Sequence, residues 1–158
     1  MAVKAIPEGY HSVTPYLIID GAAQAIEFYK KAFGATELMR LLMGDKIGHA
    51  EIKLGDSHVM LSDEWPEMGH LSPKKRGGTS VSLMFYVEDA DAVFDRAVKA
   101  GATVQKPMQD QFYGDRTGTV TDPYGHVWSI GKHVEDVPTD ELQRRMQSWS
   151  KEHEGSAA

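Results

Sequence analysis

The sequence predicts an α+β fold made of two tandem βαβββ modules followed by a C-terminal helix. The first observation is an internal repeat, because the chain matches itself when it is shifted by 68 residues. At that offset residues 12–20 align with residues 80–88, and residues 58–59 align with residues 126–127. The second observation is that each half reads as a strand, an amphipathic helix and then three shorter strands.

In each half, the first strand and the helix carry the clearest patterns. Residues 13–19 and 81–87 are rich in β-branched and aromatic residues, which favours strands. The helix that follows each strand has one apolar face, and Gly34 and Gly101 stand where a C-cap glycine belongs. The predicted apolar faces are Ala22, Ile26, Tyr29 and Phe33 in the first half, and Ala90, Val93, Phe94 and Ala97 in the second. The shorter strands are expected at residues 36–43, 47–54 and 58–62, and at residues 103–107, 116–121 and 126–131.

Composition shifts suggest where the modules begin and end. We assign residues 10–66 to the first module and residues 80–134 to the second. Residues 67–79, rich in Gly, Pro, Ser and charge, are predicted to form a linker or lid loop. Residues 135–158 are expected to form a C-terminal helix and a frayed tail, with Thr139 as a helix N-cap.

The bulk composition excludes several classes of function. The chain has 158 residues and is 41% hydrophobic, as expected of a water-soluble globular protein. A net charge of −6 argues against nucleic-acid binding, which needs a basic surface. The absence of cysteine excludes disulfides and thiolate metal sites. No apolar run is long enough to span a membrane and no secretory leader is evident, so we expect a cytoplasmic protein.

Residues 122–126, with the sequence DPYGH, predict a tight turn that leads into the last strand of the second half. Tandem βαβββ modules with this turn resemble the vicinal oxygen chelate superfamily of glyoxalases, bleomycin-resistance proteins and dioxygenases. The resemblance covers residues 12–133, and the segments VTPYLIIDGAAQAIEFYKKAFGA, LGDSHVMLSDE and FYGDRTGTVTDPYGHVWSI look most like its PhnB-like branch. It implies that the module sheets curl into a cup, with His or Glu metal ligands on the first and last strand of each module.

Carried over to this chain, the four ligand positions hold unusual residues. They fall at Thr14, Ser82, Ser129 and Leu61, or at Met60 instead of Leu61 if the register slips by one. None of these side chains is a usual ligand for a divalent metal in such a site. The resemblance therefore predicts the fold, whereas these positions predict a protein without the usual metal and without a cofactor.

Six side chains are candidates for contact with an organic ligand. His49 alternates with apolar residues along its strand, which places it in the cup or on a solvated face. Arg116 offers a planar cation for a carboxylate or phosphate, or forms a surface ion pair with a residue such as Asp115. Trp65 either closes over the cup or anchors its loop. The full predicted set is His49, Ser82, Tyr86, Tyr113, Arg116 and Trp65.

Two histidines near the predicted site, His11 and His126, are not expected to contact a ligand. His11 lies close to the first ligand position but three residues too early, and we interpret it as a surface or cap histidine. His126 directly follows the turn glycine, on the strand face opposite Ser129, and is expected to make a local hydrogen bond.

Two classes of function remain open from the sequence. The first is a metal-free small-molecule-binding protein of the sequestration or resistance type, expected to be a homodimer like many members of the superfamily. The second is an enzyme, either a lyase or dioxygenase with a displaced metal site at His49, Glu51 and His58, or a metal-independent isomerase. A third possibility is a subunit of an assembly that has no ligand of its own.

Overall fold

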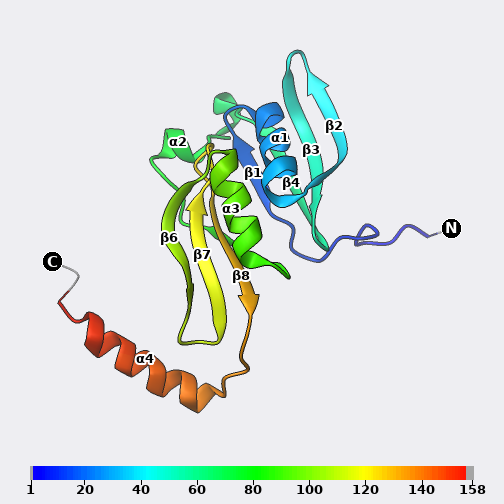
Figure 1. Cartoon of the computed structure of the whole chain (residues 1–158). Helices are drawn as coiled ribbons and strands as arrows, with labels where there is room; N and C mark the ends of the chain where they lie inside the picture. The colour runs from blue at the N-terminus through cyan, green and yellow to red at the C-terminus, as the bar shows by residue number, and fades with distance from the viewer. Residues whose placement is uncertain (1, 156–158) are drawn as a thin grey trace.

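The computed structural model describes residues 2–155 and contains two four-stranded sheets (Figure 1). In the first module the sheet order is β1-β4-β3-β2, with β1 parallel to β4 and the other neighbours antiparallel. The elements of this module are β1 (Tyr16–Ile19), α1 (Ala22–Phe33), β2 (Thr36–Met43), β3 (Lys46–Leu54) and β4 (Ser57–Asp63).

The second module repeats the same topology in the order β5-β8-β7-β6. Again the first and last strands of the module pair in parallel and the remaining pairs are antiparallel. Its elements are β5 (Ser82–Tyr86), α3 (Ala90–Ala100), β6 (Thr103–Asp110), β7 (Asp115–Thr121) and β8 (Val127–His133). The predicted tandem βαβββ fold is therefore confirmed, as two sheets that share no strand pairing within residues 2–155.

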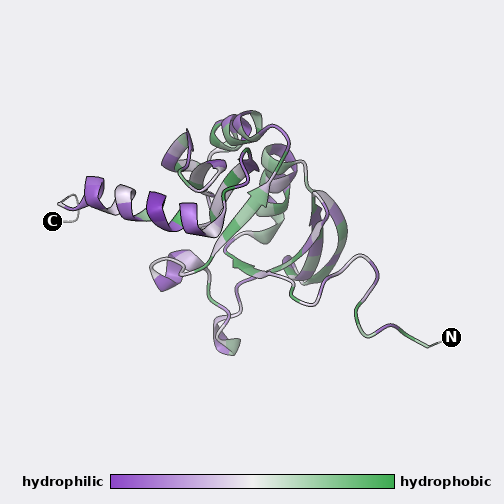
Figure 2. Cartoon of the chain, turned by 90° about the horizontal axis from the view of Figure 1, so that it is seen from below, coloured by the Kyte–Doolittle hydropathy of each residue, from purple (hydrophilic) through white to green (hydrophobic). Residues whose placement is uncertain are grey.

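Short helical segments connect the modules, and a longer helix follows them. The connection contains the 3₁₀ helix η1 (Pro66–Met68) and the one-turn helix α2 (Pro73–Arg76). Helix α4 (Thr139–His153) follows the second module, contacts it through Arg145 and the carbonyl of Phe112, and is mainly hydrophilic (Figures 1 and 2). Among the residues that the structure describes, no helix is long and apolar enough to cross a membrane.

Helices α1 and α3 pack against each other and lie side by side over the two sheets (Figure 1). All eight residues of the predicted apolar helix faces are buried in the core, which confirms both helical patterns. Gly34 and Gly101 end their helices with positive φ values of 67° and 122°, a conformation that favours glycine. Each sheet thus has one face covered by helices and one face open.

The structure differs from the predicted boundaries by one to three residues at several strand ends, and three differences have a clear description. Strand β1 begins at Tyr16 rather than residue 13, because Pro15 has no N–H to donate to the sheet and Val13 is 87% exposed. Strand β6 continues beyond residue 107 to Asp110. The prediction that Thr139 caps α4 is wrong, since Thr139 is already helical and no side chain caps this end.

The predicted turn at residues 122–126 is confirmed, because the N–H of Gly125 donates to the carbonyl of Asp122. The Asp122 Oδ1 atom also accepts hydrogen bonds from the N–H groups of Tyr124 and His126, at 2.9 and 3.0 Å. The imidazole Nε2 of His126 lies 3.0 Å from the carbonyl oxygen of Ile18, so this ring joins the turn before β8 to β1 instead of making the local hydrogen bond that was predicted. The turn therefore also helps to hold the two modules together.

Candidate functional site

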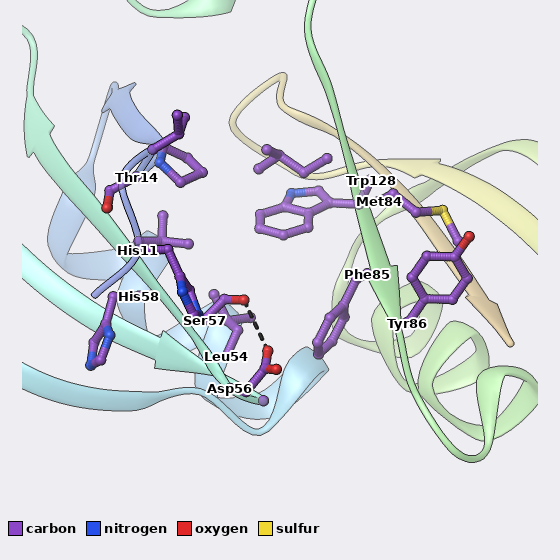
Figure 3. A pocket seen from close by; sticks show the side chains of 15 residues that line it. His11, Thr14, Leu54, Asp56, Ser57, His58, Met84, Phe85, Tyr86 and Trp128 are labelled. Carbon is purple, nitrogen blue, oxygen red and sulfur yellow. Dashed lines mark hydrogen bonds between the residues drawn. The ribbon is translucent and has the colours of Figure 1, made fainter. Parts of the chain in front are cut away.

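A cavity of about 480 Å³ lies between the two modules (Figure 3). The first module contributes the segment that leads into β1 and the turn between β3 and β4, and the second contributes β5 and Trp128 of β8. The turn reaches across to β5, since a Cβ added at Gly55 would lie 3.6 Å from the ring of Phe85. Contact between the two modules thus creates the cavity.

Aromatic rings held in fixed positions form one side of this cavity. Trp128 and Phe85 both contact Phe33 of α1, with ring centroids 4.8 and 5.5 Å apart. The indole N–H of Trp128 donates to Asp122 Oδ2 at 2.9 Å, and the Tyr29 hydroxyl donates to the same oxygen at 2.6 Å. Burial, together with the Asp122 carboxylate, raises the pKa of Tyr29 well above its usual value, so Tyr29 remains a donor. The flat apolar surface is therefore fixed before any ligand binds.

Polar groups from the first module line the opposite side. The Ser57 hydroxyl donates to the Asp56 carboxylate at 3.0 Å. The His58 ring is positioned by the carbonyl of Gly9, 2.5 Å from its Nδ1, and by stacking on Tyr10. Figure 3 shows Asp56 and Ser57 facing Phe85 across the cavity, whereas the His58 ring points away from Phe85 and Trp128 and Tyr86 lies on the other side of β5. The arrangement offers hydrogen bonds on one side and ring stacking on the other.

The four positions that correspond to the family's metal ligands are not gathered around one point. Thr14 lines the inter-module cavity, and Ser82 is exposed at the start of β5. Leu61 is fully buried in the core of the first module. The Ser129 hydroxyl lies 3.1 Å from the Thr119 hydroxyl in a separate groove of about 460 Å³. These side chains do not fit a divalent metal, which prefers imidazole and carboxylate ligands.

The residues of the displaced metal site do not fit a metal either. His49 Nε2 lies 3.0 Å from Glu51 Oε1, and its Nδ1 lies 2.9 Å from the Tyr16 hydroxyl, so protein atoms occupy both ring nitrogens. His58 is held by Gly9 instead. Within residues 2–155 no group of three His, Cys, Asp or Glu side chains is placed to hold a metal ion.

The structure does not bring the six predicted ligand-binding residues together. Tyr86 borders the inter-module cavity, but its ring lies on the side of β5 opposite Phe85, and Tyr113 lines the separate groove between the second sheet and α4. Arg116 forms ion pairs with Asp91 at 2.8 Å and with Asp110 at 3.3 Å. His49 and Ser82 lie on strands away from both places, and Trp65 forms a bridge with His70 in the connecting segment.

The prediction from sequence missed the residues that do converge. Phe85 and Trp128 alternate with the predicted residues along β5 and β8. Their side chains therefore lie on the strand face opposite the one that the family resemblance indicates. His11 is exposed, as expected of a surface histidine, and it also lines the cavity. The signal for Phe85 and Trp128 was their aromatic character on the apolar strand face, but their role depends on how the modules meet.

Comparison with known proteins supports a family assignment. Residues 10–130 match the model of the Glyoxalase/Bleomycin resistance protein/Dioxygenase superfamily. The uncharacterized protein Rv0887c of Mycobacterium tuberculosis is 44% identical over 152 residues, which cover 94% of this chain and 87% of that protein.

Two further relatives extend the comparison. The anthracycline biosynthesis protein DnrV of Streptomyces peucetius is 29% identical over 124 residues, covering 77% of this chain and 41% of DnrV. The crystal structure of TioX from Micromonospora sp. ML1 superposes with a TM-score of 0.62 at 25% identity, covering 81% of this chain and all of TioX.

Proposed function

The chain belongs to the Glyoxalase/Bleomycin resistance protein/Dioxygenase superfamily, and from that premise we propose that it binds a small organic molecule between its two modules. The observation that supports this proposal is the inter-module cavity of about 480 Å³, a size typical of ligand pockets. The ring of Trp128 on one wall is already held by its hydrogen bond to Asp122, which lowers the cost of ordering that ring on binding. Binding of this kind suits a sequestration or resistance protein.

The lining of the cavity favours a flat, mostly apolar ligand that carries a few polar groups. The rings of Phe85 and Trp128 provide a surface for stacking, and Asp56 and Ser57 provide hydrogen-bonding groups opposite them. The relative DnrV is an anthracycline biosynthesis protein, which is consistent with a polycyclic aromatic ligand. We therefore use an anthracycline as the first probe.

A matched pair of substitutions tests the proposed site. Ser57→Phe places a ring in the cavity, whereas Ser80→Phe adds the same ring at an exposed loop position outside it. We expect doxorubicin or 8-anilinonaphthalene-1-sulfonate to bind the wild-type chain, measured by fluorescence titration. Affinity should fall about tenfold in Ser57→Phe, the equivalent of about 1.4 kcal/mol, and stay unchanged in Ser80→Phe. Equal affinity in the two variants, or no binding to the wild-type chain, would contradict the proposal.

We further propose that this binding needs no divalent metal and no cofactor. Thr14, Ser82, Ser129 and Leu61 supply no imidazole or carboxylate at the family's ligand positions. The probe should therefore bind with the same affinity before and after dialysis against EDTA. A loss of affinity that added Zn²⁺ or Mn²⁺ restores would show that a metal takes part.

We also propose that the chain belongs to the PhnB-like branch of the superfamily and that the protein is cytoplasmic.

We propose that the protein acts as a homodimer. The edge strand β2 of the first sheet leaves large apolar side chains exposed, among them Leu42 and Met43. Helix α4 leaves Met146 and Trp149 about half exposed. A second copy of the chain is the partner that we propose for these surfaces. Light scattering after size exclusion should give twice the mass of one chain at micromolar concentration, and a monomer would contradict it.

A further inference from the structure

A chain of four hydrogen-bonded side chains crosses the open face of the first sheet. The Tyr16 hydroxyl on β1 lies 2.9 Å from Nδ1 of His49 on β3. The other ring nitrogen of His49, Nε2, lies 3.0 Å from Oε1 of Glu51. The second carboxylate oxygen of Glu51 accepts a hydrogen bond from the Tyr10 hydroxyl. The order of groups is therefore hydroxyl, imidazole, carboxylate, hydroxyl.

The chemistry of the end groups fixes the direction of these hydrogen bonds. Partial burial and the adjacent Glu51 raise the pKa of Tyr10 to about 12, so Tyr10 remains a donor. The hydrogen bond from Tyr10, and next the one from His49, lower the pKa of Glu51, which is therefore an ionised acceptor. Glu51 then requires a proton on His49 Nε2, which leaves the lone pair of Nδ1 to accept the proton of Tyr16.

Accessibility increases along the chain toward Tyr16. The Glu51 and His49 side chains are 18% and 27% exposed, whereas Tyr16 is 45% exposed. The cross-strand neighbours on this face are apolar, since Leu41 lies opposite His49 and Met60 opposite Tyr16. Tyr16 is thus the most exposed of these three residues, and it lies beside apolar side chains.

We propose that Tyr16 is a nucleophile that accepts acyl groups from small, apolar, activated esters, with His49 as its general base and Glu51 orienting the imidazole. A nucleophile within hydrogen-bond reach of a base that a third group orients is the arrangement on which such catalysis depends. This activity is independent of ligand binding in the inter-module cavity. It uses the open face of the first sheet.

The proposed step is balanced without any further reactant. The Tyr16 oxygen attacks the acyl carbon while its proton passes to Nδ1 of His49. The bond from the acyl carbon to the leaving oxygen then breaks, and that oxygen takes the proton from Nδ1. An acyl-tyrosine remains, and water attacks it by the reverse sequence, releasing the acid and restoring the Tyr16 hydroxyl.

The second module contains an internal control for this reaction. Tyr86 is 56% exposed, and its hydroxyl donates to Asp115 Oδ2 at 2.6 Å. It is at least as accessible as Tyr16, but its partner is a carboxylate, which is a weaker base than imidazole. Asp115, and to a lesser degree partial burial, raise the pKa of Tyr86, which opposes its activation.

The experiment treats the full chain with p-nitrophenyl acetate, follows p-nitrophenol release, and locates acetyl groups by peptide mass spectrometry. We expect Tyr16 to be acetylated at least about tenfold faster than Tyr86, because general-base assistance contributes factors of about 10² or more. His49→Gln should reduce the rate at Tyr16 about tenfold or more. Tyr86→Phe, the matched control, should leave that rate unchanged.

Several outcomes would overturn the proposal. They are equal rates at Tyr16 and Tyr86, an undiminished rate at Tyr16 in folded His49→Gln, and acetylation confined to lysines. Circular dichroism checks that His49→Gln is folded. If that variant does not fold, the ratio of the two tyrosine rates in the wild-type chain decides the question by itself.

Discussion

The two modules each contain a hydrogen-bonded chain that begins with a tyrosine on the first strand, but the order of groups differs. In the first module Tyr16 meets an imidazole, and the carboxylate lies behind it. In the second module Tyr86 meets the carboxylate of Asp115, and the imidazole of His133 lies behind it, with Nδ1 2.7 Å from Asp115 Oδ1. The same residue types on the same topology therefore give a hydroxyl next to an imidazole in one module and a hydroxyl next to a carboxylate, a weaker base, in the other.

The two hydrogen-bonded chains of side chains differ in burial as clearly as in the order of their groups. Asp115 is only 7% exposed and joins three strands, since it lies on β7 and binds Tyr86 of β5 and His133 of β8. Glu51 lies on β3, the same strand as His49, and is less deeply buried. The comparison indicates that the hydrogen-bonded side chains of the second module contribute mainly to stability. Those of the first module have a reactive group, Tyr16, at their more exposed end.

The largest expected effect comes from removing the charge at the centre of the second chain. Asp115→Asn should lower the free energy of unfolding by about 2–3 kcal/mol, because two hydrogen bonds to a buried carboxylate are weakened or lost. Glu51→Gln, the matched change in the first module, should cost about 1 kcal/mol or less. Urea unfolding followed by circular dichroism measures both, and equal losses would remove the proposed difference between the chains.

The second prediction concerns the dependence of stability on pH. Hydrogen bonds to Asp115 and, next, to Asp136 raise the pKa of His133, so its imidazolium form favours the folded state. This stabilisation is fully present below the unfolded-state pKa of about 6.5 and is lost as pH rises through the higher folded-state value. The wild-type chain should therefore lose stability in that interval, as measured by thermal melts at a series of pH values.

His133→Gln should remove this contribution to the slope. His70→Gln is the control, since it changes an exposed histidine and leaves His133 and its two carboxylates in place. A slope that persists unchanged in His133→Gln would contradict the assignment of the effect to this residue.

The sequence predicted the fold well because repetition and periodicity are local signals. The apolar faces that contain Tyr29 and Phe94 are buried as predicted, since a period of 3.6 residues is enough to identify them. The site was less accessible to such reasoning. The sequence suggests Asp115 as one partner of Arg116. Adjacent strand residues point to opposite faces, however, and Arg116 pairs with Asp91 and Asp110 instead.

Contacts between distant segments explain the remaining differences. The link between Tyr86, Asp115 and His133 depends on the register of three strands, which no short motif specifies. The inter-module cavity depends on how the two modules pack, and the repeat contains no information about that packing. Residues such as Phe85 acquire their place in the cavity only from this arrangement.

The smallest expected effect is at the buried end of the first chain. Tyr10→Phe removes the hydrogen bond that is the largest cause of the lowered Glu51 pKa, and keeps the ring that stacks on His58. The pKa of Glu51 should therefore rise toward its ordinary value of about 4.5, with a stability loss of about 0.5–1 kcal/mol at neutral pH. A lowered folded-state pKa stabilises the protein above the unfolded-state value, and this contribution disappears as pH falls through the folded-state value. The variant should thus lose less stability than the wild-type chain on acidification.

Carbon NMR of the Glu51 carboxyl group measures the change in its pKa, and Tyr113→Phe is the control. An unchanged titration of Glu51 in Tyr10→Phe would show that Tyr10 does not determine the charge of Glu51.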